Sequence, residues 1–214
     1  MKSIIKELYK GLRTYESQKG QILAGNNEEP AGVYLIRRGY VKTYDITFQG
    51  ESQIIAISGP GEIFPLYWAL DKEYRQLFYQ AMTPIEFSVL SKPEFKDRYE
   101  NDSELQKEII ELLLRAYKFS QQRIQNLEYK SPRERLAYRL LFLGKYFGHV
   151  RRDQLVIDMP LTYQDLADSL NITRDTANRA SLELMKQGLI ERLDHKVVIK
   201  DVDGMKEIIG TDLA

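Results

Sequence analysis

The segment from Asn101 to Lys130 contains neither glycine nor proline, and it separates two regions with different hydrophobic patterns. Strong helix formers dominate it, so the sequence predicts one long helix over residues 101–129. Apolar residues in this helix follow alternating steps of four and three, which is the spacing of a coiled-coil seam. The residues of the seam are Leu105, Ile109, Leu112, Ala116 and Phe119. We therefore predict that the helix pairs two copies of the chain into a homodimer.

A second apolar stripe lies beside the seam, formed by Ile110, Leu113, Leu114 and Tyr117. A helix with two apolar stripes must bury both of them. One stripe can cover the protein's own β-domain while the other meets a partner helix, and we assign the partner to the seam. The alternative is one broad stripe that faces the core of a monomer.

The region before the long helix is rich in turns and in short strand-like runs. "GVYLIRRGYVKTYDI" (32–46) places apolar residues and tyrosines around Gly39, as a hairpin would, and "TFQGESQIIAIS" (47–58) repeats the pattern around Gly50. Ile85, Phe87 and Val89 alternate with polar residues, which predicts a strand with one buried face. Short strands at this spacing predict an antiparallel, jelly-roll-like β-roll over residues 1–100.

The region after the long helix is predicted to begin with a helix that is capped by Ser131 and ends near Phe147. Thr162 and Asp165 form a capping box, so another helix should begin at about Tyr163. The turn between this helix and the next contains Asn171, which tolerates a left-handed conformation. Two helices joined by so short a turn form a helix-turn-helix motif.

The second helix of this motif should be capped by Thr173 and should end at Gly188. Its inner face is predicted to contain Ala177, Leu184 and Met185, together with Leu182 or the neighbouring Ala180. Its outer face begins with Arg174, Asp175, Asn178 and Arg179. In a helix-turn-helix motif this end faces base edges in the major groove, where arginine can bind guanine and a carboxylate can accept from cytosine. The alternative is an ordinary pair of surface helices.

The alternation in "GLIERLDHKVVIKD" (188–201) then predicts a two-stranded wing. The wing should contact the DNA backbone through Arg192, His195 or Lys196. The whole predicted fold is therefore α+β: a β-roll, a long dimerisation helix and a winged helix-turn-helix domain over residues 130–214.

Composition limits the other functions. The chain carries 31 basic and 31 acidic residues, so charge alone does not predict DNA binding. These 214 residues contain no cysteine, which excludes cysteine-held iron–sulfur clusters and thiolate zinc sites. We find no run of about 18 apolar residues and no signal-peptide core, so we expect a cytoplasmic protein with no membrane partner.

In this order of regions the chain resembles the cyclic-AMP receptor/fumarate-nitrate regulator family of bacterial transcription regulators. The most specific match is "ITRDTANRA" (172–180), which is similar to the start of the family's recognition helix. The resemblance implies that Arg174, Asp175 and Arg179 read bases, and that residues 1–100 form a cyclic-nucleotide-binding-like sensor. It also implies phosphate contacts by Thr162, Gln164, Thr173 and Thr176. The family more often has glutamate at Asp175, and Asn178 replaces a residue that is often small.

The effector site departs from the family pattern. Pro65 and Leu66 stand where cyclic-nucleotide binders have a Gly-Glu pair, and Arg75 is followed by Gln76 instead of serine. The resemblance therefore argues against control by cyclic AMP. The segment "FPLYWAL" (64–70) either lines a pocket for a less polar ligand or fills the roll, and we favour filling. A pocket would involve Glu62, Leu66, Tyr67, Trp68 and Arg75. Haem is not favoured, because both histidines lie outside residues 1–148.

Three functions remain in competition. The first is a homodimeric transcription regulator that binds a near-palindromic operator, with an unknown small-molecule effector and RNA polymerase as a possible partner. The second is a family member whose DNA binding needs no effector. The third is a metal enzyme on the roll, which residues 1–148 disfavour because they contain no histidine. We therefore expect no enzyme activity, no bound metal and no cofactor.

Overall fold

The computed structural model describes residues 3–25, 28–71, 77–126 and 131–210. The chain forms two compact units, one of residues 1–47 with 54–119 and the other of residues 48–53 with 120–214. Within the described residues, no helix is long and apolar enough to cross a membrane.

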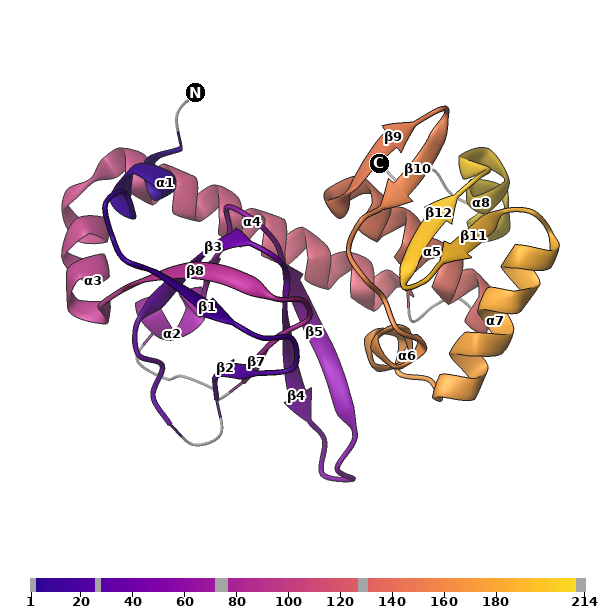
Figure 1. Cartoon of the computed structure of the whole chain (residues 1–214), viewed down its shortest axis with the longest axis horizontal. Helices are drawn as coiled ribbons and strands as arrows, with labels where there is room; N and C mark the ends of the chain where they lie inside the picture. Colours follow the sequence, from indigo (N-terminus) through magenta and orange to yellow (C-terminus); the bar gives the residue numbers. More distant parts are fainter. Residues whose placement is uncertain (1–2, 26–27, 72–76, 127–130, 211–214) are drawn as a thin grey trace. The chain divides into compact units, whose positions relative to one another are not determined.

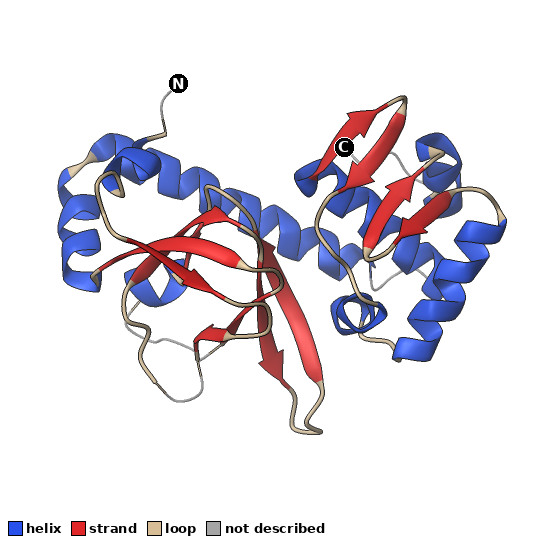
Figure 2. Cartoon of the chain, in the orientation of Figure 1, coloured by secondary structure: helices blue, strands red, loops and turns tan. Residues whose placement is uncertain are grey.

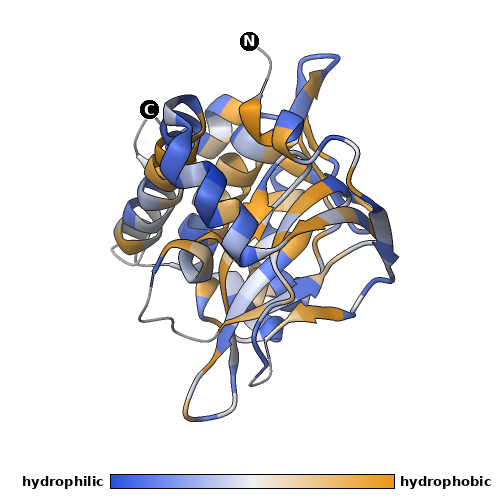
Figure 3. Cartoon of the chain, turned by 90° about the vertical axis from the view of Figure 1, so that its left-hand side faces the viewer, coloured by the Kyte–Doolittle hydropathy of each residue, from blue (hydrophilic) through white to orange (hydrophobic). Residues whose placement is uncertain are grey.

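The first unit is an antiparallel β-roll of two four-stranded sheets (Figures 1 and 2), which confirms the predicted fold class. One sheet has the order β1-β8-β3-β6, with bounds Thr14–Ser17, Ile85–Leu90, Val33–Arg38 and Ile63–Phe64. The other has the order β2-β7-β4-β5, with bounds Ile22–Ala24, Phe78–Ala81, Val41–Ile46 and Ser52–Ser58. Hydrophobic residues recur along these strands (Figure 3).

The predicted hairpin around Gly39 is wrong, because β3 and β4 belong to different sheets. Gly39 has a φ of +88°, and a Cβ atom there would lie 2.5 Å from the carbonyl oxygen of Pro84. The chain therefore needs glycine where it crosses from one sheet to the other. The hairpin in this region is β4–β5, which turns around Gly50.

Stacked aromatic rings fill the space between the two sheets. The ring centroids of Tyr34 and Phe64 are 4.9 Å apart, and those of Phe64 and Tyr79 are 5.3 Å apart. Phe87 lies 5.4 Å from Tyr34, and all four residues are buried. The roll therefore has a packed aromatic interior.

Four helices cover the roll: α1 (Ile4–Leu8), α2 (Leu66–Leu70), α3 (Lys92–Asn101) and α4 (Ser103–Asn126). They enclose a second apolar cluster that includes Ile5, Tyr9, Trp68, Phe95, Leu105 and Ile109. Glu108 of α4 anchors α1, since its carboxylate accepts hydrogen bonds from Ser3 Oγ (2.6 Å) and the Ile5 backbone N–H (2.9 Å).

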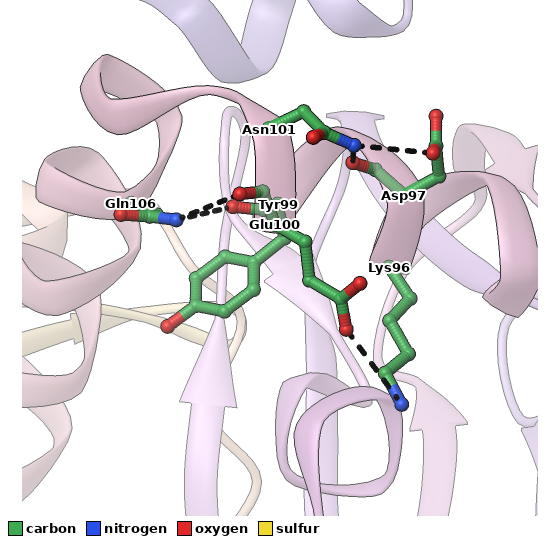
Figure 4. A network of polar contacts seen from close by, with 6 residues as sticks. All are labelled: Lys96, Asp97, Tyr99, Glu100, Asn101 and Gln106. Carbon is green, nitrogen blue, oxygen red and sulfur yellow. Dashed lines mark hydrogen bonds and ion pairs between the residues drawn. The ribbon is translucent and has the colours of Figure 1, made fainter.

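The corner between α3 and α4 is held by a polar network (Figure 4). Gln106 Nε2 donates to the carbonyl oxygen of Tyr99 at 2.7 Å, at the end of α3. Asp102 Oδ1 accepts from the backbone N–H groups of Glu104 and Leu105 at the start of α4. The helix predicted from residue 101 therefore begins at Ser103, because Asp102 caps it.

The second unit packs helices against the four-stranded sheet β11-β12-β10-β9 (Figure 2). Its strands are β9 (Gly148–Arg151), β10 (Gln154–Ile157), β11 (Ile190–Leu193) and β12 (Lys196–Ile199). Its helices are α5 (Pro132–Phe147), α6 (Tyr163–Leu170), α7 (Arg174–Lys186) and α8 (Val202–Ile209). Ser131 caps α5 in a capping box with Glu134, and α5 contacts α6, α7 and α8. This is the predicted winged helix-turn-helix arrangement.

Candidate nucleic-acid interface

Helix α6 begins where the capping box predicts. Thr162 Oγ1 accepts from the Asp165 backbone N–H at 3.0 Å, and Asp165 Oδ2 accepts from the Thr162 backbone N–H at 3.1 Å. The helix ends at Asn171, whose φ of 54° is left-handed. The two helices of the motif are therefore joined by the tight turn that the sequence predicts.

Helix α7 packs its small residues inward. Ala177, Ala180 and Leu184 are buried as predicted, whereas Leu182 is exposed and Met185 is half-buried. Ser181 takes the inner position instead, and its hydroxyl donates to the Ala177 carbonyl oxygen at 2.8 Å. This hydrogen bond satisfies the hydroxyl, so a small polar residue can pack beside Ala180, which is the buried one of the two alternatives.

The outer face of α7 presents the predicted base-reading residues. Arg174, Asp175 and Arg179 are exposed, and Asn178 is half-buried. Thr173 caps the helix by accepting from the Thr176 backbone N–H at 3.2 Å, as predicted.

Side-chain hydrogen bonds link the first two turns of this face. The Oγ1 atoms of Thr173 and Thr176 lie 2.8 Å apart, and Arg179 Nη2 lies 3.5 Å from Thr176 Oγ1. Arg179 thus extends toward Thr176, in the direction of the start of the helix.

Gln164, on the first helix of the motif, is held by a residue that the sequence analysis overlooked. Its Nε2 donates to Asp168 Oδ1 at 2.6 Å, and Asp168 is buried. The amide keeps a second N–H for an external acceptor. The spacing of four residues on one helix could have predicted this contact. Gln164 also borders a shallow pocket of about 450 Å³, together with Thr162, Tyr163, Arg174, Arg192, Asp194 and His195.

The wing forms as β11 and β12, but two of its three predicted backbone contacts are engaged within the protein. Arg192 Nη2 donates to the Leu161 carbonyl oxygen, so its guanidinium group is turned inward. Lys196 Nζ lies 3.2 Å from Asp158 Oδ1. The other oxygen of this carboxylate contacts His149 Nδ1. His195 is exposed on the turn. The contact of Arg192 with the DNA backbone stays a prediction, but within the domain its guanidinium group already has one carbonyl acceptor and the ring of Tyr163.

The candidate effector residues Leu66, Tyr67 and Trp68 lie on α2 and point in different directions. Trp68 is buried and Leu66 packs against the same cluster, because α2 turns its apolar face to the core. Tyr67 is 55% exposed on the opposite side. Arg75 lies outside the described residues. The packing of Leu66 and Trp68 agrees with the filling role, which stays a prediction.

Glu62 is partly buried beside this segment, and burial raises the pKa of its carboxyl group. The Gly59 backbone N–H, which donates to Glu62 Oε2 at 2.9 Å, opposes this rise, and so do the charge of Arg115 and a hydrogen bond with Ser58. Because the pKa is higher in the folded state, the carboxyl contributes stability below its unfolded pKa and loses it as pH rises through the folded pKa.

We therefore expect Glu62→Gln to raise the thermal unfolding midpoint at neutral pH, with the gain shrinking as the pH falls below the folded-state pKa of Glu62 and its carboxyl group becomes neutral. Thermal unfolding measured across this range tests the prediction. Glu86→Gln, which removes a carboxylate from an exposed ion pair, serves as the control and should show little effect. A Glu62→Gln protein that is less stable at neutral pH would contradict the prediction.

The structure buries part of the predicted seam of α4 and leaves the other apolar stripe exposed. Leu105 and Ile109 are buried in the protein's own core and Leu112 packs against that core, so they cannot form the predicted seam. Ala116 is exposed, and the side chain of Phe119 lies outside the described residues. The exposed apolar residues of α4, which we call the outer stripe, are Ile110, Leu113, Leu114, Tyr117 and Ile124, each 41–61% exposed.

Comparisons with known proteins agree with both units. Residues 15–102 match the cyclic nucleotide-binding domain family, and residues 134–208 match the Crp-like helix-turn-helix domain family. The anaerobic regulatory protein of Haemophilus influenzae is 26% identical over 200 residues, covering 91% of this chain and 76% of that protein. The fumarate and nitrate reduction regulatory protein of Escherichia coli K12 is 25% identical over 193 residues, covering 90% and 77%.

Solved structures share the fold. FixK2 from Bradyrhizobium japonicum has a TM-score of 0.79 at 20% identity, covering 94% of this chain and 98% of that one. A CooA mutant from Carboxydothermus hydrogenoformans has a TM-score of 0.76 at 24% identity, covering 96% and 89%.

Proposed function

The chain belongs to the cyclic-AMP receptor/fumarate-nitrate regulator family of transcription regulators, and we propose that it binds a near-palindromic operator as a homodimer. Residues 1–100 are assigned to the sensor-type roll, residues 101–129 to dimerisation and residues 130–214 to DNA binding. The observation that carries the proposal is the exposed, pre-ordered start of α7. Since its target is the operator, we place the protein in the cytoplasm.

In this proposal the first turns of α7 enter the major groove. Arg174 and Arg179 donate to guanine, Asp175 accepts from cytosine, and Asn178 borders the same bases. Thr162, Gln164, Thr173 and Thr176 contact phosphates at the starts of α6 and α7, where free backbone N–H groups also favour anions. The Thr162 hydroxyl, which donates to Asp165 Oδ2 at 2.6 Å, turns from this carboxylate to the phosphate when DNA binds. The bonds of Thr176 and Asp168 support these roles, because they fix the side chains of Arg179 and Gln164.

The outer stripe of α4 forms the dimer interface. Its five large apolar side chains would otherwise stay in water, and pairing them across a two-fold axis removes that cost. The two recognition helices then read half-sites about 34 Å apart, which is one turn of DNA.

The effector of this dimer is not cyclic AMP. The support is that Pro65 and Leu66 stand where the family pattern has a Gly-Glu pair, and that Leu66 and Trp68 pack into the core. A family member that binds DNA without an effector is the second candidate, and the packed aromatic interior of the roll favours it.

Selection of bound duplexes from a random DNA pool tests the proposal. We expect a near-palindrome whose half-sites are about 10 base pairs apart, centre to centre. An enriched single half-site would contradict the dimer, and no enrichment would contradict sequence-specific binding. Calorimetry of the selected complex against a panel of metabolites then separates the two candidates, since only a regulated protein should bind one of them at unit stoichiometry.

A further inference from the structure

Arg192 connects the wing to the first helix of the motif. It lies on β11, and its Nη2 donates to the carbonyl oxygen of Leu161, two residues before α6 begins. The Cζ atom of the same guanidinium group lies 4.4 Å from the ring centroid of Tyr163, the first residue of α6. A guanidinium group this close to an aromatic ring makes a cation–π contact.

Leu161 is held by the wing from both sides. Its backbone N–H donates to the carbonyl oxygen of His195 at 2.8 Å, on the turn between β11 and β12. Its carbonyl oxygen accepts from Arg192, and its side chain is buried. The residue next to the helix cap Thr162 therefore cannot shift without moving the wing.

The desolvation of the Arg192 guanidinium group argues against a direct contact between Arg192 and DNA. Its Nη1 atom is buried and has no hydrogen-bond partner among the described residues. Burial also lowers the pKa of the guanidinium group, with the nearby Tyr163 opposing the shift. A residue that served only to contact phosphate would keep its guanidinium group in solvent, where it is not desolvated.

We propose that Arg192 is a positioning residue that locks the wing to the start of α6 and thereby sets the affinity of the domain for the DNA backbone. The lock holds Thr162 and Gln164 at a fixed place relative to the wing turn, so both can reach phosphates of one duplex. It does not read bases. This inference rests on the proposed DNA binding of the second unit.

Four substitutions in the full-length protein test the lock, with affinity measured on the selected operator and on random duplex. We expect Arg192→Ala and Tyr163→Leu each to weaken both affinities by about tenfold, and the double variant to be no weaker than either. Arg192→Lys should behave like Arg192→Ala, because lysine lacks the planar fork. Tyr163→Phe keeps the ring and should bind like the wild type.

Salt dependence separates positioning from direct contact. Thr162 and Gln164 are neutral, so their displacement should leave the slope of log affinity against log salt unchanged. If Arg192 itself touched a phosphate, Arg192→Ala would reduce the slope by about 0.9, and Arg192→Lys would retain most of the affinity. Either result would overturn the lock, and so would loss of affinity in Tyr163→Phe.

Thermal unfolding without DNA tests the contact independently of the proposed function. The destabilisation caused by Arg192→Ala and Tyr163→Leu should be less than additive in the double variant, since both remove the same contact. Additive losses would overturn the lock. A wild-type protein that bound no duplex would instead refute the proposed function and the effect of the lock on affinity, while leaving this coupling measurable.

Discussion

Glutamate at both Ile110 and Leu114 will convert the protein to a monomer and reduce its affinity for the operator by about 100-fold or more, because a dimer gains this much from binding two half-sites at once. Both side chains lie on the outer stripe, 50% and 53% exposed, so the substitutions should leave the fold of each protomer intact. In a dimer, four carboxylates would meet in an apolar interface, where unpaired charge is strongly unfavourable. Sedimentation analysis measures the oligomeric state, and fluorescence anisotropy measures the affinity.

Ala116→Glu is the matched control for this experiment. It adds one negative charge to the same helix at an exposed position that lies off the outer stripe. We expect it to leave a dimer with nearly normal affinity. If Ala116→Glu produced monomers while the double variant stayed dimeric, the interface would follow the seam read from the sequence instead of the outer stripe.

Local interactions made the helix boundaries predictable. Three helices are capped by Ser131, Thr162 and Thr173, each of which contacts the residue three positions ahead. Four consecutive residues are therefore enough to predict each cap. The left-handed turn at Asn171 follows from the same kind of local preference. The helix-turn-helix motif, which these caps define, is therefore predictable from the sequence alone.

Contacts distant in sequence account for the errors. The two stripes of α4 have similar composition, and only the packing of Ile5, Tyr9 and Phe95 against Ile109 decides which one is covered. Gly39 predicts a change of chain direction, but the sequence around it does not determine which sheet the next strand joins. Such choices depend on the surface that each element meets, which periodicity does not encode.

The candidate site shows the same division. Exposure of Arg174 and Arg179 follows from helical periodicity once Ala177 is placed inside. The inward orientation of Arg192 does not follow from periodicity. It depends on the ring of Tyr163, which is 29 positions away on another element. A side chain on a predicted wing can thus be assigned to DNA by position and still serve the protein.

Arg179→Ala will remove discrimination at one base pair of each half-site, at a cost of about 1–3 kcal/mol per half-site for the preferred base. Arg179 is exposed on the outer face, and its contact with Thr176 directs it along the first turns of α7. Binding curves for operators substituted at each position measure the loss, which should be confined to one symmetric pair of positions. Affinity for random duplex should change little.

Two further variants define what Arg179 contributes. Arg179→Lys keeps the charge but cannot make two parallel hydrogen bonds to guanine, so it should lose most of the discrimination. Lys186→Ala removes a positive charge from the last turn of the same helix, where no base contact is proposed, and should leave the sequence preference unchanged. If Arg179→Ala weakened operator and random DNA equally, Arg179 would be a backbone contact, and base reading would have to rest on Arg174, Asp175 and Asn178.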